Sequence, residues 1–254
     1  FACRALLFVW GFYFIPRKFR SGSHRFGLSG LVPCSGCCMN TSAPLLIANH
    51  SSALTDFVIL LAFHLPAFVA MAPVRNYPVL GRLAEGIGCL FVDREKKKGG
   101  TRATGDAKRK PGAAQLIKDR VDGYSPEYAA PRLAIFPEGT VTQAHSLSRF
   151  RTGAFLPGAP VQPLCIHYSG CGTDLSTLNL SGGPSDAVIF LRMLTSIANY
   201  VSLEYLPIYE PSTAEKRDPK LYANNVRRVM AAALGYPTSE HTFEDMFLQG
   251  KTGG

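Results

Sequence analysis

Short apolar runs bounded by turn residues recur along the chain, and helical patterns separate several of them. The runs cover residues 43–49, 67–74, 88–93, 133–136, 160–168 and 201–209. Apolar runs of four to eight residues are typical of strands that are buried on both faces of a parallel sheet. Such strands can be joined only by crossover connections, which are usually helices. This pattern constrains the fold more than any other feature of the sequence.

The segments between these runs supply the helices. A helix is expected to begin at about Ser52 or Thr55, since either residue can serve as its N-cap. Residues 113–121 resume a helical pattern, and residues 218–234 form a helix that Asp218 opens and Gly235 ends. Strands that alternate with helices predict an α/β fold with a mostly parallel central sheet flanked by helices.

The length of 254 residues is consistent with a single domain of this class. We expect an N-terminal apolar, interfacial segment and connector over residues 1–39. The α/β domain would then cover residues 40–248, followed by a tail over 249–254. Within the domain, residues 94–112 are basic, rich in Gly and without periodicity, which predicts an exposed loop.

Composition and charge favour a membrane surface as a partner. The chain is 46% hydrophobic and only 18% charged, which is more apolar than most soluble domains of this size. Its net charge of +9 would attract anionic lipid, nucleic acid or a phosphorylated substrate. The basic loop lacks interleaved aromatic residues, so a nucleic-acid partner is not expected.

The cysteines do not predict a metal site. Three of the seven lie in the stretch CSGCC at residues 34–38, but no second cluster with ligand spacing follows. We therefore expect no metal, and free thiols that face a reducing, cytosolic compartment.

Two apolar segments raise the question of membrane insertion. Residues 5–15 are apolar and precede Pro16 and a basic cluster, but they fall short of the roughly 20 residues that a spanning helix needs. This segment predicts either a membrane-associating helix at the bilayer interface or a core helix. Residues 57–74 reach spanning length, but His64, Pro66 and Pro73 interrupt them, which favours a buried helix followed by a buried strand.

Polar residues follow three of the predicted strands directly. His50 follows the first, Asp93 and Arg94 follow another, and residues 137–140 (Pro-Glu-Gly-Thr) follow a third. The carboxyl ends of parallel strands lie at one edge of a sheet, where ligands bind. These residues would therefore point into one cleft if their strands lie near one another.

His50 and Asp56 could form an acid/base pair. A histidine can take a proton from a hydroxyl while a carboxylate on its other ring nitrogen orients it. No Gly-x-Ser-x-Gly motif occurs, and Ser51 and Ser52 adjoin His50 too closely for easy activation. The hydroxyl would then belong to a substrate. The alternative is a structural histidine at a helix entrance.

The chain resembles the glycerolipid acyltransferase family, and within it the lysophosphatidylcholine and lysophosphatidylethanolamine acyltransferases. Four blocks occur in the order of that family, and a C-terminal stretch resembles the segment after the fourth block in this subgroup. The blocks are NHSSALTD, GCLFVDRE, FPEGTVTQAHSLSRFRTGAF and PGAPVQPL, and the C-terminal stretch is LYANNVRRVMAAALGYPTSEHTFED. The resemblance as a whole extends from about Leu6 to Asp245, and the blocks and the C-terminal stretch lie between Asn49 and Asp245.

The resemblance implies transfer of a fatty acyl group from acyl-CoA, as co-substrate, to a lysophospholipid hydroxyl, with no covalent acyl-enzyme and no cofactor. His50 would be the general base and Asp56 the residue that orients it. The residues implied in substrate binding are Arg94, Phe136, Pro137, Glu138, Gly139, Thr140, Arg149 and Arg151. Arg94 would hold the phosphate of the acceptor, while Glu138, Gly139 and Thr140 would shape the loop. Arg149 and Arg151 would add charge for that phosphate or for the phosphates of CoA. Arg149 and Arg151 could equally be solvated surface residues. Residues 160–163 would contribute shape.

The spacing of the first block departs from that of the family. Five residues separate His50 from Asp56, whereas the family has four, which places Thr55 at the usual position of the carboxylate. Neither spacing stacks the pair on one helical face, so the histidine must lie in the turn before the helix. A turn can absorb one residue, which favours Asp56 over Thr55.

Two rival functions remain, a catalytically silent lipid-binding protein of the same fold and an acyl hydrolase. A silent protein would have lost the geometry of the histidine and carboxylate, and a hydrolase would need a protein nucleophile or a water site beside an oxyanion hole. The resemblance further implies a membrane-associated enzyme of the endoplasmic reticulum whose active site faces the cytosol.

Overall fold

The computed structural model describes ten segments of the chain, and all structural statements below refer to them. These are residues 2–20, 43–52, 55–78, 80–92, 112–124, 131–139, 141, 146–169, 186–196 and 198–240. Most of the predicted basic loop, the tail at 249–254 and the predicted boundary at residue 40 lie outside them.

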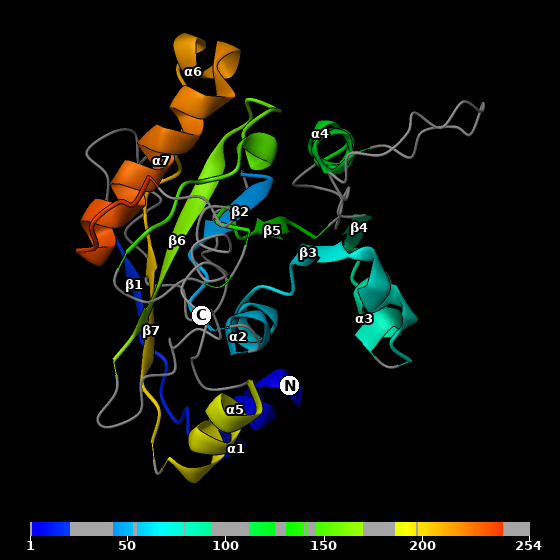
Figure 1. The fold of residues 1–254 in the computed structure, drawn as a ribbon, viewed down its shortest axis with the longest axis vertical. Helices are drawn as coiled ribbons and strands as arrows, with labels where there is room; N and C mark the ends of the chain where they lie inside the picture. The colour runs from blue at the N-terminus through cyan, green and yellow to red at the C-terminus, as the bar shows by residue number, and fades with distance from the viewer. Residues whose placement is uncertain are drawn as a thin grey trace, which may run out of the picture.

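Seven strands of the described residues form one sheet in the order β1-β7-β6-β2-β5-β3-β4 (Figure 1). All neighbouring strands are parallel except β6 and β7. The prediction of a mostly parallel sheet flanked by helices is therefore confirmed. The strands are β1 (Arg17–Phe19), β2 (Leu45–Ala48), β3 (Ala67–Met71), β4 (Leu90–Val92), β5 (Leu133–Ile135), β6 (Val161–Tyr168) and β7 (Val201–Tyr205).

Helices connect the strands, and the predicted ones at residues 113–121 and 218–234 are present. Asp218 caps the last long helix by accepting hydrogen bonds from two backbone N–H groups, and Gly235 ends it with a φ of 70°. The helices are α1 (Ala2–Val9), α2 (Thr55–Phe63), α3 (Leu80–Gly86), α4 (Ala113–Asp122), α5 (Asp186–Thr195), α6 (Thr213–Arg217) and α7 (Pro219–Leu234), with two 3-10 turns, η2 (Ala72–Asn76) and η3 (Thr152–Ala154).

The two faces of the sheet are covered by different helices. Successive side chains of a strand point to opposite faces. Leu45 and Ile47 of β2 accordingly pack in one core with residues of α7 and α4. Leu46 and Ala48 of the same strand pack in a second core with residues of α1 and α2. The all-apolar sequence of β2 is explained by this double burial.

The N-terminal apolar run is not one helix. α1 ends at Val9, and Gly11 adopts a left-handed φ of 82°, which turns the chain before Phe12. Leu7, Trp10 and Phe12 are buried against α2, so part of the run belongs to the core. Among the described residues, no helix has both the length and the apolar character needed to span a bilayer.

The second apolar run is divided as expected into a buried helix and a strand. α2 ends at Phe63, and the chain passes through Leu65, whose φ is 46°, and Pro66 before β3 begins at Ala67. Three residues of α2 between Val58 and Leu60 are buried in the core. The prediction from His64 and the prolines is confirmed.

His64 is held in its neutral form at the end of α2. Its Nε2 lies 2.8 Å from the hydroxyl of Tyr205, and its Nδ1 is buried without a hydrogen-bond partner. Burial, followed by the charges of Arg132 and Arg17, lowers the pKa of His64 from 6.5 to about 4. Between these two values the unfolded chain binds the proton and the folded chain does not.

Folding stability should therefore fall as the pH drops from about 6.5 to about 4, and His64→Gln should remove part of this fall. Urea unfolding at about pH 7 and about pH 5 measures the difference. The control Leu65→Gln changes an exposed neighbour and should keep the wild-type fall. If His64→Gln and wild type lost the same stability between about pH 7 and about pH 5, burial of neutral His64 would not explain the fall.

Candidate active site

The side chain of Asn49 forms the last hydrogen bonds of β2, directly before His50. Its amide Nδ2 donates to the carbonyl of Ile166 at 3.0 Å, and its Oδ1 accepts from the Ile166 N–H at 2.7 Å. The side chain thus continues the hydrogen bonding between β2 and β6 after Ala48. The main chain is free to turn towards α2, and it places His50 at the carboxyl edge of the sheet with 7% of its surface exposed.

His50 is paired with Asp56. The Nδ1 atom of His50 lies 2.9 Å from Oδ2 of Asp56, which is in the first turn of α2 and fully buried. The same oxygen accepts hydrogen bonds from the backbone N–H groups of Ser51 at 2.8 Å and Ser52 at 2.9 Å. An ionised carboxylate can only accept, so Nδ1 carries the proton and Nε2 is the acceptor atom of the neutral ring.

The extra residue between His50 and Asp56 lies in the turn before α2. Because the turn curls around the Asp56 carboxylate, the histidine reaches it despite the longer spacing. The hydroxyl of Thr55, which occupies the usual position of the family carboxylate, accepts a hydrogen bond from Ser52 Oγ at 3.1 Å. Asp56 is thus the acid that contacts the His50 ring.

Tyr168, which the sequence did not single out, holds the other carboxylate oxygen. Its hydroxyl donates a short hydrogen bond to Asp56 Oδ1. Burial, and after it the negative charge of Asp56 and this hydrogen bond, raise the pKa of Tyr168 well above its usual value. The phenol therefore stays neutral and remains a donor. Its position at the end of β6, beside β2, was the one available sign of this role.

Two phenylalanines form an apolar wall around the imidazole. The ring of Phe136 stacks on His50 with centroids 4.1 Å apart, and the ring of Phe57 meets it edge-on at 5.6 Å. The two phenylalanine rings also contact each other, with centroids 5.3 Å apart. Phe136, one of the predicted substrate-binding residues, thus lies against His50 and restricts how the ring can turn.

The carboxylate of Glu138 ties the loop after β5 to His50. Its Oε1 accepts from the His50 backbone N–H at 3.3 Å, and its Oε2 accepts from Ser148 N–H at 3.1 Å and Ser148 Oγ at 2.9 Å. Only 1% of Glu138 is exposed. β2 and β5 are neighbours in the sheet, so the predicted meeting of His50 with this loop is observed.

Arg151 lies against the same loop. Its backbone N–H donates to the Pro137 carbonyl at 2.7 Å. Gly139 has a left-handed φ of 73°, and a β-carbon at this position would collide with the Arg151 guanidinium. The left-handed conformation favours glycine at this position, and the absence of a β-carbon leaves room for the arginine side chain. The exposed side chain of Arg151 can present positive charge at the loop that Glu138 ties to His50.

The other predicted binding residues are placed differently. Arg149 is exposed, and after Arg227 it is one of the cations that hold the pKa of Glu240 below its usual range. Asp93, Arg94 and Thr140 lie outside the described residues. In the described part of the chain, no three or more His, Cys, Asp or Glu side chains gather in a way that could hold a metal ion.

Glu138→Gln should destabilise the fold by about 1–3 kcal/mol. The NH₂ of the new amide would face hydrogen-bond donors that now donate to a carboxylate oxygen. The change in the free energy of urea unfolding measures this. Glu210→Gln makes the same substitution at an exposed position and should change stability by less than about 0.5 kcal/mol. Equal stabilities of the two variants would show that the buried bridge contributes nothing.

Comparisons with known proteins show the family to which the chain belongs. The family model described as Acyltransferase matches residues 39–167. Human lysophosphatidylcholine acyltransferase 1 is 37% identical over 232 residues, which are 91% of this chain and 39% of that protein. A Drosophila melanogaster lysophosphatidylcholine acyltransferase is 36% identical and is covered to 36%. A lysophospholipid acyltransferase of Arabidopsis thaliana is 35% identical, with 96% of this chain and 60% of that protein covered.

A solved structure shares the fold. The crystal structure of the 1-acyl-sn-glycerophosphate acyltransferase from Thermotoga maritima superposes with a TM-score of 0.51 at 16% identity. The superposition covers 91% of this chain and 76% of the Thermotoga maritima chain. The chain spans about two fifths of the length of the human and fly relatives. The matched family model includes His50, Asp56 and the loop after β5, and the chain belongs to the acyltransferase family.

Proposed function

We propose that this chain transfers a fatty acyl group from acyl-CoA to the free hydroxyl of a lysophospholipid, with lysophosphatidylcholine or lysophosphatidylethanolamine as acceptor. The observation that carries the proposal is the 2.9 Å contact between His50 Nδ1 and the buried Asp56 carboxylate at the carboxyl edge of the sheet. The names of the relatives, which are lysophosphatidylcholine and lysophospholipid acyltransferases, support the choice of acceptor.

His50 would act as the general base. Its Nε2 takes the proton of the acceptor hydroxyl as the oxygen attacks the thioester carbonyl of acyl-CoA. The tetrahedral intermediate collapses, the carbon–sulfur bond breaks, and the thiolate of CoA receives the proton from the imidazolium. Asp56 stabilises the imidazolium between the two steps and keeps the ring in the required tautomer.

The hydroxyls of the neighbouring serines have other partners, which supports attack by a substrate hydroxyl. Ser51 Oγ accepts from the Asn49 amide at 3.3 Å, and Ser52 Oγ donates to Thr55 at 3.1 Å. The backbone N–H groups of both serines are bonded to Asp56. A serine nucleophile would have to break these bonds, so the hydrolase alternative is less well supported than direct transfer.

The intact pair also argues against a catalytically silent lipid-binding protein. Such a protein would have no need to bury a carboxylate with hydrogen-bond donors on both oxygens, one of them the imidazole of His50. Burial of a charge is costly unless it is paired in this way. The arrangement supports the role of His50 as a base.

The acceptor phosphate would bind beside the loop after β5. Arg151 lies against this loop, and a guanidinium can hold two phosphate oxygens at once. We propose that Arg94 and Thr140 complete this site, with Arg149 available for the phosphates of CoA. The carboxylate of Glu138 would act indirectly, by fixing the backbone of His50.

The setting that we propose is a membrane surface, with residues 5–15 at the bilayer interface. Phe8, Val9, Tyr13 and Phe14 are exposed large apolar residues of this segment. Such residues next to Arg17 and Lys18 favour an interfacial position. An endoplasmic reticulum membrane, with the active site on the cytosolic side, would supply both substrates.

His50→Ala and Asp56→Asn should each lower kcat by about 10²–10⁴-fold, because the first removes the base and the second removes its orienting charge. The measurement is release of free CoA from oleoyl-CoA in the presence of a panel of lysophospholipids. His167→Gln, which changes a histidine paired with Glu204, should keep near-wild-type activity. If wild type shows no acceptor-dependent release, the proposed reaction is wrong.

Tyr168→Phe should lower kcat by roughly tenfold and leave KM for the acceptor unchanged, since the phenol positions Asp56 and does not contact substrate. The same CoA-release assay gives both constants. Tyr200→Phe, at an exposed tyrosine nearby, serves as the control. A rise in KM with unchanged kcat would show that Tyr168 binds the acceptor instead.

A further inference from the structure

α5 exposes a row of apolar side chains on one side. Val188, Leu191 and Leu194 are 40%, 60% and 44% exposed. Residues three positions apart lie on the same side of a helix, so the three form one stripe. Contiguous exposed apolar surface of this kind marks an interaction site on soluble domains.

The N-terminal segment exposes a second apolar set. Phe8 and Val9 at the end of α1 are 61% and 70% exposed, and Tyr13 and Phe14 after the turn are 58% and 75% exposed. The rings of Phe8 and Tyr13 meet edge-on with centroids 5.1 Å apart. These residues occupy the outer side of the same segment whose inner side, at Leu7 and Phe12, is buried.

Hydrogen bonds hold the two segments that carry these sets near each other. The Asn199 amide Nδ2 donates to the Trp10 carbonyl at 2.7 Å, and the Asn199 N–H donates to the Gly11 carbonyl at 2.9 Å. Asn199 lies a few residues after the end of α5, so the ends of α1 and α5 are fixed beside each other. Figure 1 shows the two helices together at one end of the molecule.

Positive charge borders this surface. Arg192 is exposed on α5, and Arg17 is exposed on β1. The guanidinium groups of Arg4 and Arg17 lie over the ring of Phe63 at 5.2 Å and 5.5 Å from its centroid. Apolar residues rimmed by arginine complement a bilayer that contains anionic lipid.

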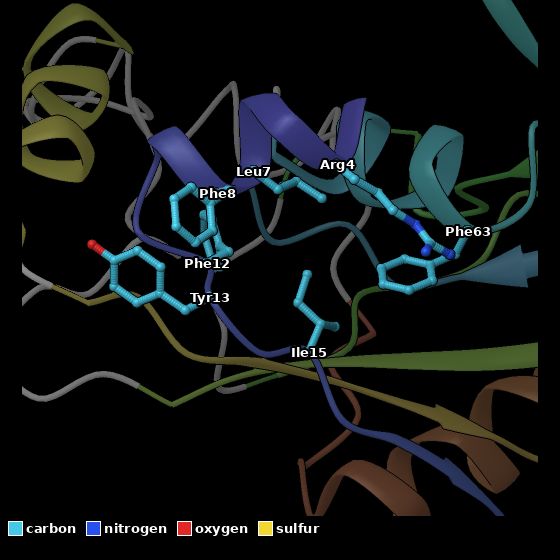
Figure 2. A pocket seen from close by; sticks show the side chains of 7 residues that line it. All are labelled: Arg4, Leu7, Phe8, Phe12, Tyr13, Ile15 and Phe63. Carbon is cyan, nitrogen blue, oxygen red and sulfur yellow. The ribbon is translucent and has the colours of Figure 1, made fainter. Parts of the chain in front are cut away.

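A small cavity opens within the same region. It has a volume of about 160 Å³, and Figure 2 shows the rings of Phe8 and Tyr13 at one side of it and Arg4 with Phe63 at the other. The aromatic and aliphatic side chains of the lining suit part of an acyl chain, and the Arg4 guanidinium suits an anionic head group at the edge.

The surface adjoins the candidate active site. The Ser169 N–H donates to the Tyr200 carbonyl at 3.1 Å, and the residue before Ser169 is Tyr168, which contacts Asp56. Tyr200 itself is 53% exposed and directly follows Asn199. This hydrogen bond ties the segment after α5 to the end of β6, which carries Tyr168.

We infer that α5 and the N-terminal segment form one docking face for an anionic bilayer, with α5 as a second membrane contact. This face is defined by Phe8, Val9, Tyr13, Phe14, Val188, Leu191 and Leu194. The inference extends the proposed interfacial position of residues 5–15 and does not depend on acyl transfer. Its tests measure binding, so their failure can be told apart from failure of the proposed reaction.

The first test places a fluorescent reporter on α5. Trp10 is the only tryptophan of the chain, so Leu191→Trp in a Trp10→Phe background gives a single reporter on the docking face. Vesicles that contain brominated phosphatidylcholine and phosphatidylserine should quench this reporter. Leu221→Trp in the same background, at an exposed position of α7, should not be quenched. Equal quenching of both reporters, or of neither, would overturn the inference.

The second test keeps Trp10 and measures vesicle affinity by co-sedimentation. Leu191→Gln with Leu194→Gln should weaken binding by roughly tenfold or more, because two partly exposed leucines lose their burial in lipid. The matched variant, Leu221→Gln with Val229→Gln on α7, should bind like wild type. Wild-type affinity in the α5 variant would exclude α5 from the membrane contact. If the protein bound no vesicles but captured another protein, the face would be a protein-binding surface instead.

The third test examines charge. Arg17→Gln with Arg192→Gln should weaken binding to vesicles with phosphatidylserine by about fivefold per residue, which corresponds to about 1 kcal/mol each. Binding to vesicles of phosphatidylcholine alone should change little. An equal loss on both kinds of vesicle would contradict selection for anionic lipid.

Discussion

The candidate site depends on one buried carboxylate. Asp56 Oδ2 accepts hydrogen bonds from the imidazole of His50 and from the two backbone N–H groups that follow it, and Oδ1 accepts from Tyr168. The same group therefore shapes the turn between β2 and α2, fixes the ring that it contacts and ties α2 to β6. With both oxygens bonded, the charge is stabilised without solvent. One carboxylate thus holds the turn, the His50 ring and the end of β6 together.

Apolar runs predicted most of the sheet because β2, β3 and β5 are buried in the core and leave a continuous signal in the sequence. β1 left none. Its three residues, Arg17–Phe19, are exposed and two of them are basic, and they form a strand only because β7 offers an open edge. α5 was missed for a different reason, since its residues 187–191 are a continuous apolar run, which does not distinguish a helix from a strand.

The pair of His50 and Asp56 could be predicted because both residues lie in one short motif. The spacing left Thr55 as an alternative to Asp56 as the partner of His50. Only the structure shows that Asp56 makes this contact, while Thr55 bonds to Ser52. Tyr168 could not be predicted, because its contact depends on which strand lies beside β2. Glu138 was expected to shape its loop, but its bonds to Ser148 and to the His50 backbone are long-range contacts that no local pattern encodes.

The end of β2 accepts very few side chains. Asn49 meets a carbonyl and an N–H of the same residue, Ile166, with one amide group that offers a donor and an acceptor side by side. Aspartate would set two acceptors against that carbonyl, and glutamine would add a methylene to a fixed gap. The strand thus ends on a side chain that imitates a peptide group, and the position of His50 follows from that imitation.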